Sequence, residues 1–279
     1  MSVGGLGDEI RKKLTKKVAF PLLNRLIGDR GDHLYHYSAE MDRLFPIRTF
    51  DWRTYRFLST GELDSDRWWH SLRTLEVGGG TILDVGANTG YTAAWFSTIA
   101  DRVYAFEPDP GNVEILREQI RIRGLTNVEI RDCAVSEAPG RVELHLKERG
   151  GHHALSDVGA SATLGTASVQ CTTVDEFMRD EGVGTVSLLK VDVEGFEPEV
   201  LRGARVGLSS GAIQRVLLEF SPEFYRRRGI DDRAPLTILT DHGFVPYLAT
   251  GDPFDPDDPR ASDQCDVLAF APGVSAWES

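Results

Sequence analysis

The sequence predicts a doubly wound α/β fold, built on a mostly parallel seven-stranded sheet and preceded by an N-terminal helical cap. Two observations favour this class. From residue 81 onward, apolar runs of strand length alternate with helical patterns, as expected of a parallel sheet covered on both faces. The first run also leads into a glycine-bracketed turn, Gly86 to Gly90, that opens a helix, which is typical of Rossmann-like folds.

The elements follow from the apolar periodicity. Core strands are expected at 81–85, 102–106, 127–131, 185–191 and 214–220, with two closing strands in 243–250 and 264–271. Helices are expected near 89–100, 111–123, 174–181, 198–205 and 233–242. The alternating run 141–147 predicts an exposed strand, and the Gly-rich polar stretch that follows it, to about residue 166, predicts a loop that acts as a lid.

The first 60 residues are interpreted as a helical extension or cap, and residues 61–279 as the main domain. Apolar residues at helical spacing predict a helix over 6–27, which could pack on the main domain, mediate a homodimer or rest on a membrane surface. Residues 28–60 show no clear period and predict an irregular cap, whereas 62–76 again predicts a helix.

Composition limits the partners. A net charge of -12 argues against a nucleic acid, because phosphate binding needs clustered Lys and Arg. Cys133, Cys171 and Cys265 are too few and too scattered for a disulfide framework or a zinc site. The sequence shows no convincing signal peptide and no apolar run of the ~20 residues that a membrane-spanning helix needs, so we expect a cytoplasmic protein.

The turn after the first strand predicts a nucleotide site. Glycines let the backbone approach a ligand closely, at the N-terminus of a helix. The dinucleotide pattern fails, because Asn88 and Tyr91 stand where its later glycines belong. Asp84 next to the turn suits an amine-bearing ligand better than a phosphate, and Glu107 ends the next strand, where a ribose diol would accept a carboxylate partner. The sequence therefore indicates an adenosine derivative.

Four motifs in the order DVGANTG, AFEPDP, NVEIRDCAVS and KVDVEGFEPEVLRG resemble the FkbM family of S-adenosylmethionine-dependent methyltransferases, over roughly residues 55–272. The resemblance implies a class I methyltransferase fold, with a partly antiparallel final strand pair, and transfer of a methyl group to a hydroxyl of a sugar or secondary metabolite. It places the methionine part of the cofactor beside Asp84, Gly86, Asn88 and Gly90, the ribose at Glu107, and the adenine at Asp132, Cys133 and Ala134. Asp192 and Glu194 would lie near the methyl group and the small-molecule acceptor.

The proton of an acceptor hydroxyl needs a base, and the sequence offers more than one. Asp192 and Glu194 stand two apart at a strand end and should point to one side in extended geometry. His152 and His153 lie in the expected lid and are the second candidates. A divalent metal that acidifies the acceptor is less favoured, because the full set of oxygen ligands is not evident.

Other residues carry two readings each. Glu219, which closes the fifth core strand, could line the acceptor pocket or cap the helix that starts at Pro222. The cluster Arg226 to Arg228 is expected to pair with nearby acids in preference to binding an anionic acceptor.

Three alternative functions remain: methyl transfer to nitrogen or carbon, a nicotinamide-dependent oxidoreductase, and a non-catalytic cofactor-binding subunit.

Overall fold

The computed structural model describes residues 33–38, 43–48, 77, 79–147, 163–248, 251–254 and 264–275. They belong to two compact units: strands β1 (His33–Ser38) and β2 (Arg43–Arg48) lie in the first, and all elements from β3 onward lie in the second. The helices expected over 6–27 and 62–76 lie outside the described residues, as do His152 and His153. The predicted boundary at residue 60 therefore stays a prediction.

Strands β1 and β2 form an antiparallel pair, in which His33 lies opposite Arg48 and Ser38 opposite Arg43. The expectation of an irregular segment over 28–60 is wrong for these residues. Aromatic and branched side chains such as Tyr35, Phe45 and Ile47 favour extended backbone.

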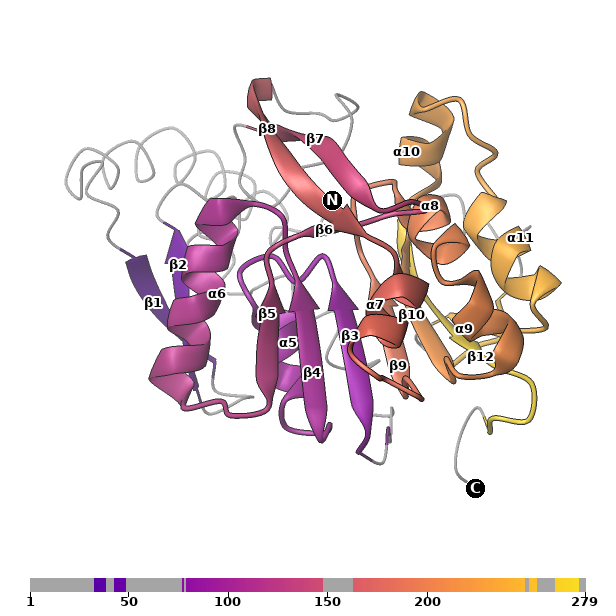
Figure 1. The fold of residues 1–279 in the computed structure, drawn as a ribbon, viewed down its shortest axis with the longest axis horizontal. Coiled ribbons are helices and arrows are strands. Elements are labelled where there is room, and N and C mark those ends of the chain that lie inside the picture. The colour runs from indigo at the N-terminus through magenta and orange to yellow at the C-terminus, as the bar shows by residue number, and fades with distance from the viewer. Residues whose placement is uncertain are drawn as a thin grey trace, which may run out of the picture. The chain divides into compact units, whose positions relative to one another are not determined.

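The second unit is built on a seven-stranded sheet in the order β11-β12-β10-β9-β3-β4-β5 (Figure 1). Its strands are β3 (Thr81–Val85), β4 (Arg102–Phe106), β5 (Val128–Arg131), β9 (Leu188–Val191), β10 (Arg215–Phe220), β11 (Val245–Leu248) and β12 (Cys265–Phe270). Neighbours from β10 to β5 pair in parallel, and β12 is antiparallel to both β10 and β11. The mostly parallel sheet and its partly antiparallel end are confirmed.

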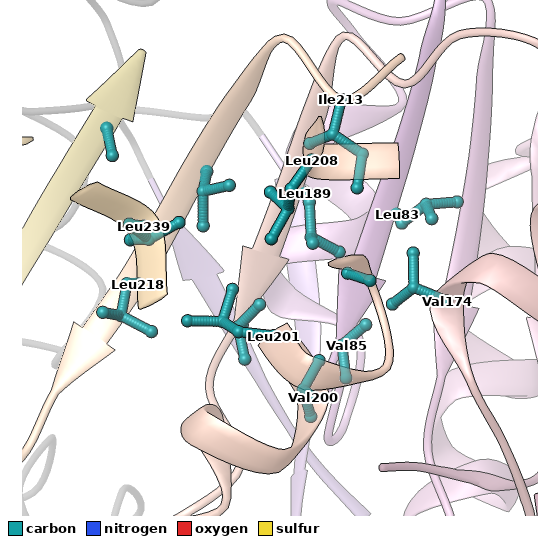
Figure 2. Close-up of a cluster of buried hydrophobic side chains, with 14 of the residues drawn as sticks. Leu83, Val85, Val174, Leu189, Val200, Leu201, Leu208, Ile213, Leu218 and Leu239 are labelled. Atoms are coloured by element: carbon teal, nitrogen blue, oxygen red, sulfur yellow. The ribbon is translucent and has the colours of Figure 1, made fainter. Parts of the chain in front are cut away.

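One face of this sheet is packed by helices α7 (Val174–Asp180), α8 (Glu197–Arg202), α9 (Arg205–Ser210) and α11 (Ala234–Asp241). Figure 2 shows strand side chains such as Leu83, Val85 and Leu189 in one buried cluster with Leu201 and Leu208 of these helices. These side chains are at most 1% exposed. Because side chains alternate along a strand, Asp84 and Lys190, which are directly paired, point to the opposite face.

Helix α5 (Tyr91–Phe96) covers that opposite face beside β3 and β4, and α6 (Pro110–Arg123) packs on β5. The single helix predicted over 198–205 is instead two, α8 and α9. Gly203 ends α8 against the Ser136 carbonyl, where an added Cβ would lie 2.1 Å from the oxygen. Asp175 then accepts hydrogen bonds from Val206 N at 2.8 Å and Gly207 N at 2.9 Å, so that a carboxylate caps the new helix.

A small second sheet has the order β6-β8-β7, with β6 (Ala134–Val135), β7 (Gly140–Lys147) and β8 (Thr163–Thr172). Because β6 starts soon after β5 ends, this sheet lies at the carboxyl edge of the large one (Figure 1). The strand predicted at 141–147 is confirmed; Arg141 and Glu143 on it are exposed, whereas Leu144 is buried. The loop predicted to run to residue 166 is wrong over 163–166, which belong to β8 and pair with β7. No helix in the described part of the chain is long and apolar enough to cross a membrane.

Candidate active site at the carboxyl edge of the sheet

The glycine turn after β3 is closed by its own hydrogen bonds. All five backbone N–H groups of residues 86–90 donate to acceptors within the protein: Gly86 and Ala87 to the Phe106 carbonyl, Asn88 to Glu107, Thr89 to the Asn88 side chain and Gly90 to the Ala87 carbonyl. A phosphate cradle needs amides that point at the ligand. In this geometry the turn offers none.

The two glycines of the turn are required by packing within the protein. Gly86 has φ of 79°, and a Cβ there would lie 1.8 Å from the Asp192 carbonyl oxygen. Gly90 has φ of 90°, and its Cβ would lie 2.4 Å from the Leu116 side chain. The close backbone approach predicted from the glycines is present, but it is made to the loop after β9 and to α6.

Glu107 is a buried carboxyl group at the end of β4, with 5% of its surface exposed. It accepts hydrogen bonds from Asn88 N at 2.8 Å, Asp109 N at 2.9 Å and the Asn112 side chain at 3.3 Å. Burial raises the pKa of Glu107 to about 7, although these hydrogen bonds oppose the shift. Glu107 therefore holds the turn in place and lies where a ribose was expected.

Asp84 is fully buried, and its carboxylate meets side chains and no turn amide. Thr92 donates to its Oδ2 at 2.6 Å, and Lys190 Nζ lies 3.1 Å from its Oδ1. The same ammonium group lies 3.3 Å from Asp192 Oδ2 and donates to the Gly86 carbonyl at 2.8 Å. Sequence reasoning gave Lys190 no role, although a lysine inside the buried run SLLKV was a signal that could have found it.

The loop after β9 turns sharply, so the premise that residues 192–194 are extended is wrong. The strand ends at Val191, and Glu194 has φ of 55°, a left-handed conformation that non-glycine residues rarely adopt. Gly195 follows with φ of 96°, packed against Phe224. The two carboxylates that the sequence pattern paired therefore do not lie on one extended segment.

Two charged side chains that have no proposed part in the reaction, Glu197 and Arg228, hold the loop after β9 in place. Glu197 is the first residue of α8, and its Oε1 accepts from Val193 N at 3.0 Å and Gly195 N at 3.1 Å. Arg228 donates to the Gly195 carbonyl and pairs with Glu199 at 2.7 Å. The expectation that Arg226, Arg227 and Arg228 pair with acids is confirmed, since their partners are Asp232, Glu223 and Glu199.

Glu219 lies at the end of β10, directly opposite Asp266 of β12. Burial raises its pKa well above the ordinary value, and the charges of Asp192, Glu194 and Asp266 raise it further. The side chain of Gln264 donates to it. Helix α10 (Pro222–Arg227) starts without a side-chain cap, so the capping reading of Glu219 is not supported. The charges of Asp192 and Glu194 thus act directly on the Glu219 carboxyl group.

The residues expected to border an adenine follow β5. Asp132 has a side chain that is 72% exposed and pairs with Arg117 at 3.4 Å. Burial raises the pKa of the Cys133 thiol to about 11, and Ala134 is 4% exposed in β6. Their role in binding stays a prediction. Among the described residues no group of three His, Cys, Asp or Glu side chains has a geometry that could hold a metal ion.

The sheet order, the glycine turn after β3 and the acid after β4 define a class I, Rossmann-like methyltransferase fold. Residues 84–246 match the family described as the Methyltransferase FkbM domain, which is more than half of the 279 residues. The chain belongs to this family, and the resemblance read from its motifs is confirmed.

The chain is also similar to two named relatives and to one solved structure. The chain is 24% identical over 186 residues to 2-O-methyltransferase NoeI of Sinorhizobium fredii, covering 61% of this chain and 75% of that protein. It is 33% identical over 160 residues to hexuronic acid methyltransferase AglP of Haloferax volcanii, covering 57% of this chain and 60% of that protein. Methyltransferase FkbM of Methylobacillus flagellatus has 18% identity and a TM-score of 0.47, over 78% of this chain and 53% of that structure.

Proposed function

We propose that the protein is an S-adenosylmethionine-dependent O-methyltransferase that acts on a hydroxyl group of a sugar or secondary metabolite. The observation that carries this proposal is the closed hydrogen bonding of residues 86–90, whose amides all have protein acceptors. A pyrophosphate would find no donors there, which disfavours a nicotinamide dinucleotide. Carboxylates beside the turn instead suit ligands that bring donors and positive charge.

The residues present fit such a cofactor. Glu107 would accept hydrogen bonds from the ribose hydroxyls, and the segment from Asp84 to Gly90 would border the methionine part. Asp132, Cys133 and Ala134 would border the adenine. When bound, S-adenosylmethionine supplies an electrophilic methyl group on a sulfonium. Lys190 and Thr92 already neutralise and fix Asp84, so it would act on the ligand through the turn that it supports.

The names of the relatives support an acceptor hydroxyl on a sugar, since one is a 2-O-methyltransferase and the other a hexuronic acid methyltransferase. In the proposed step Asp192 would take the hydroxyl proton as the acceptor oxygen bonds to the methyl carbon, and the bound cofactor would supply that methyl group and keep the electron pair of the carbon–sulfur bond on sulfur. A positioned base contributes roughly 10² to 10⁴ in rate.

Calorimetry and turnover test the proposal. The protein should bind S-adenosylhomocysteine and not NAD, and it should transfer a labelled methyl group from S-adenosylmethionine to at least one member of a panel of neutral and acidic sugars. Binding of NAD alone would support the oxidoreductase alternative. Binding of S-adenosylhomocysteine with methyl transfer to an amine and to none of the hydroxyl acceptors would replace oxygen by nitrogen as the acceptor.

A further inference from the structure

Lys190 is a charged side chain in the middle of the sheet. It is 1% exposed, and its strand neighbours Leu189 and Val191 are fully buried. An unpaired ammonium group would be strongly destabilising there, so the environment must supply compensating partners.

The compensation comes from two segments that lie far apart in sequence. Asp84 is the next-to-last residue of β3 and Gly86 lies in the turn that follows, whereas Asp192 follows β9. Their oxygens lie 3.1, 2.8 and 3.3 Å from Lys190 Nζ. One hydrogen bond to a carbonyl and two ion pairs to carboxylates thus surround the ammonium group.

The arrangement leaves part of Asp192 available. Lys190 engages Oδ2, and Oδ1 has no partner in the described part of the chain, while 26% of the side chain is exposed. The Asp192 backbone also lies against Gly86, where an added Cβ would be 1.8 Å from its carbonyl oxygen. One carboxylate oxygen is therefore held by Lys190, and the side chain stays partly exposed beside the proposed cofactor turn.

Lys190 itself does not serve as a base. Burial lowers its pKa, but the charges of Asp84 and Asp192 outweigh burial and raise the pKa above the ordinary value. The side chain remains an ammonium ion at neutral pH, which suits a fixed electrostatic anchor.

We propose that Lys190 is a positioning residue for methyl transfer: its ammonium group ties the glycine turn to Asp192 and aims the free oxygen of Asp192 at the acceptor hydroxyl. The inference rests on the proposed function, because the acceptor hydroxyl belongs to that reaction. Its structural part, the tie between two loops, can be tested without turnover.

The test compares Lys190→Met with Arg121→Met, which removes an exposed cation of α6 paired with Glu118. In Lys190→Met, amide hydrogen exchange should accelerate at least tenfold in 86–90 and 192–195, with β4 and β5 unchanged. Affinity for S-adenosylhomocysteine should fall about tenfold. The acidic limb of the kcat/KM profile should move to higher pH, because removing the ammonium group makes ionisation of the neighbouring carboxyl group less favourable. Arg121→Met should match the wild type in all three readouts.

Lys190→Met leaves the buried Asp84 and the partly exposed Asp192 without their shared cation and could fail to fold, so a second variant combines it with Asp84→Asn. The double variant restores the original net charge, yet exchange in 86–90 and 192–195 should remain fast and the acidic limb shifted. Either variant folded with wild-type exchange and an unshifted limb would overturn the proposal. A double variant that cannot fold would assign Lys190 to folding and overturn it too. If the wild type neither binds S-adenosylhomocysteine nor transfers methyl, the proposed function fails, while the exchange comparison still decides the tie between the loops.

Discussion

Glu107 connects the glycine turn to the proposed ribose position through a single carboxyl group. Its burial raises its pKa to about 7, so near neutral pH the group exchanges a proton easily. Hydroxyl groups of a ribose would donate to the ionised form and favour it. Cofactor binding and proton release at Glu107 are therefore thermodynamically linked.

The linkage predicts a pH-dependent affinity. Below about pH 7, the Glu107 carboxyl group must lose a proton before it can accept hydrogen bonds from the ribose hydroxyls. Binding of S-adenosylhomocysteine should therefore weaken about tenfold for each pH unit below 7. Glu107→Gln should bind about ten- to a hundredfold more weakly at pH 8, with a much flatter profile. Calorimetry from pH 5.5 to 8.5 on both proteins measures this. An unchanged slope in the variant would exclude Glu107 as its origin.

Asp192 carries the proposed proton transfer. Asp192→Asn should lower kcat by about 10² to 10⁴ and leave the affinity for S-adenosylhomocysteine within about threefold, because the amide cannot take the proton. Asp180→Asn is a matched control, since Asp180 is an exposed acid at the end of α7. Near-normal kcat in Asp192→Asn at saturating substrates would remove Asp192 as the base and turn attention to His152 and His153.

At the scale of elements, the site depends on contact between two loops at adjacent strand ends. Gly86 and Asp192 follow β3 and β9, which pair in parallel, so their carboxyl ends emerge side by side. The missing side chain at residue 86 lets the two backbones touch. A substitution there should disturb both halves of the proposed site together.

Gly86→Ala tests this contact against Gly124→Ala. Gly124 ends α6 with φ of 60°, and a Cβ added there would have nothing within 4 Å, so alanine should cost only the left-handed strain of about 1 to 2 kcal/mol. Gly86→Ala adds overpacking against the Asp192 carbonyl, typically a further ~1 to 3 kcal/mol. Urea unfolding measures both. Equal losses in the two variants would show that the backbones separate without penalty.

Several elements could be predicted from sequence because their signals are local. The buried runs at β3, β4 and β10 and the Pro-initiated α6 need only periodicity and capping chemistry. Strand β8 was missed because its small polar residues give a weak strand signal in the sequence. The strand is held in place by its pairing with β7. The break at Gly203 depends on contact with Ser136, which lies far away in sequence.

The residues of the candidate site show the same difference between local sequence signals and contacts that form only in the folded protein. Asp84, Glu107 and Asp192 could be named from their positions at strand ends, where open α/β sheets bind ligands. A lysine inside a buried strand could be noticed from sequence, but its pairing with Asp84 could not, because the two residues meet only once β3 and β9 lie side by side. The conformation of Glu194 likewise depends on the packing of its loop against α10.

At the scale of the whole molecule, the protein combines a net charge of -12 with carboxyl groups buried in its core. Burial raises the pKa of Glu107 and of Glu197 to about 7, and that of Glu219 well above its ordinary value. These groups hold protons in the folded state that the unfolded chain releases above about pH 4.5. For such groups the folded state binds more protons, so the free energy of unfolding falls as pH rises.

Glu197→Gln isolates one of these contributions. Between about pH 4.5 and 7 the wild type should lose stability as Glu197 ionises, by at most roughly 3 kcal/mol from this group. The glutamine keeps an oxygen for Val193 N and Gly195 N but has no proton to lose, so the variant should show a smaller decrease over the same range. Glu223→Gln, at an exposed acid of α10, is the control and should follow the wild type. Urea unfolding at half-unit pH steps measures the difference, and parallel curves for Glu197→Gln and the wild type would show that Glu197 is already ionised at pH 4.5 in the folded protein.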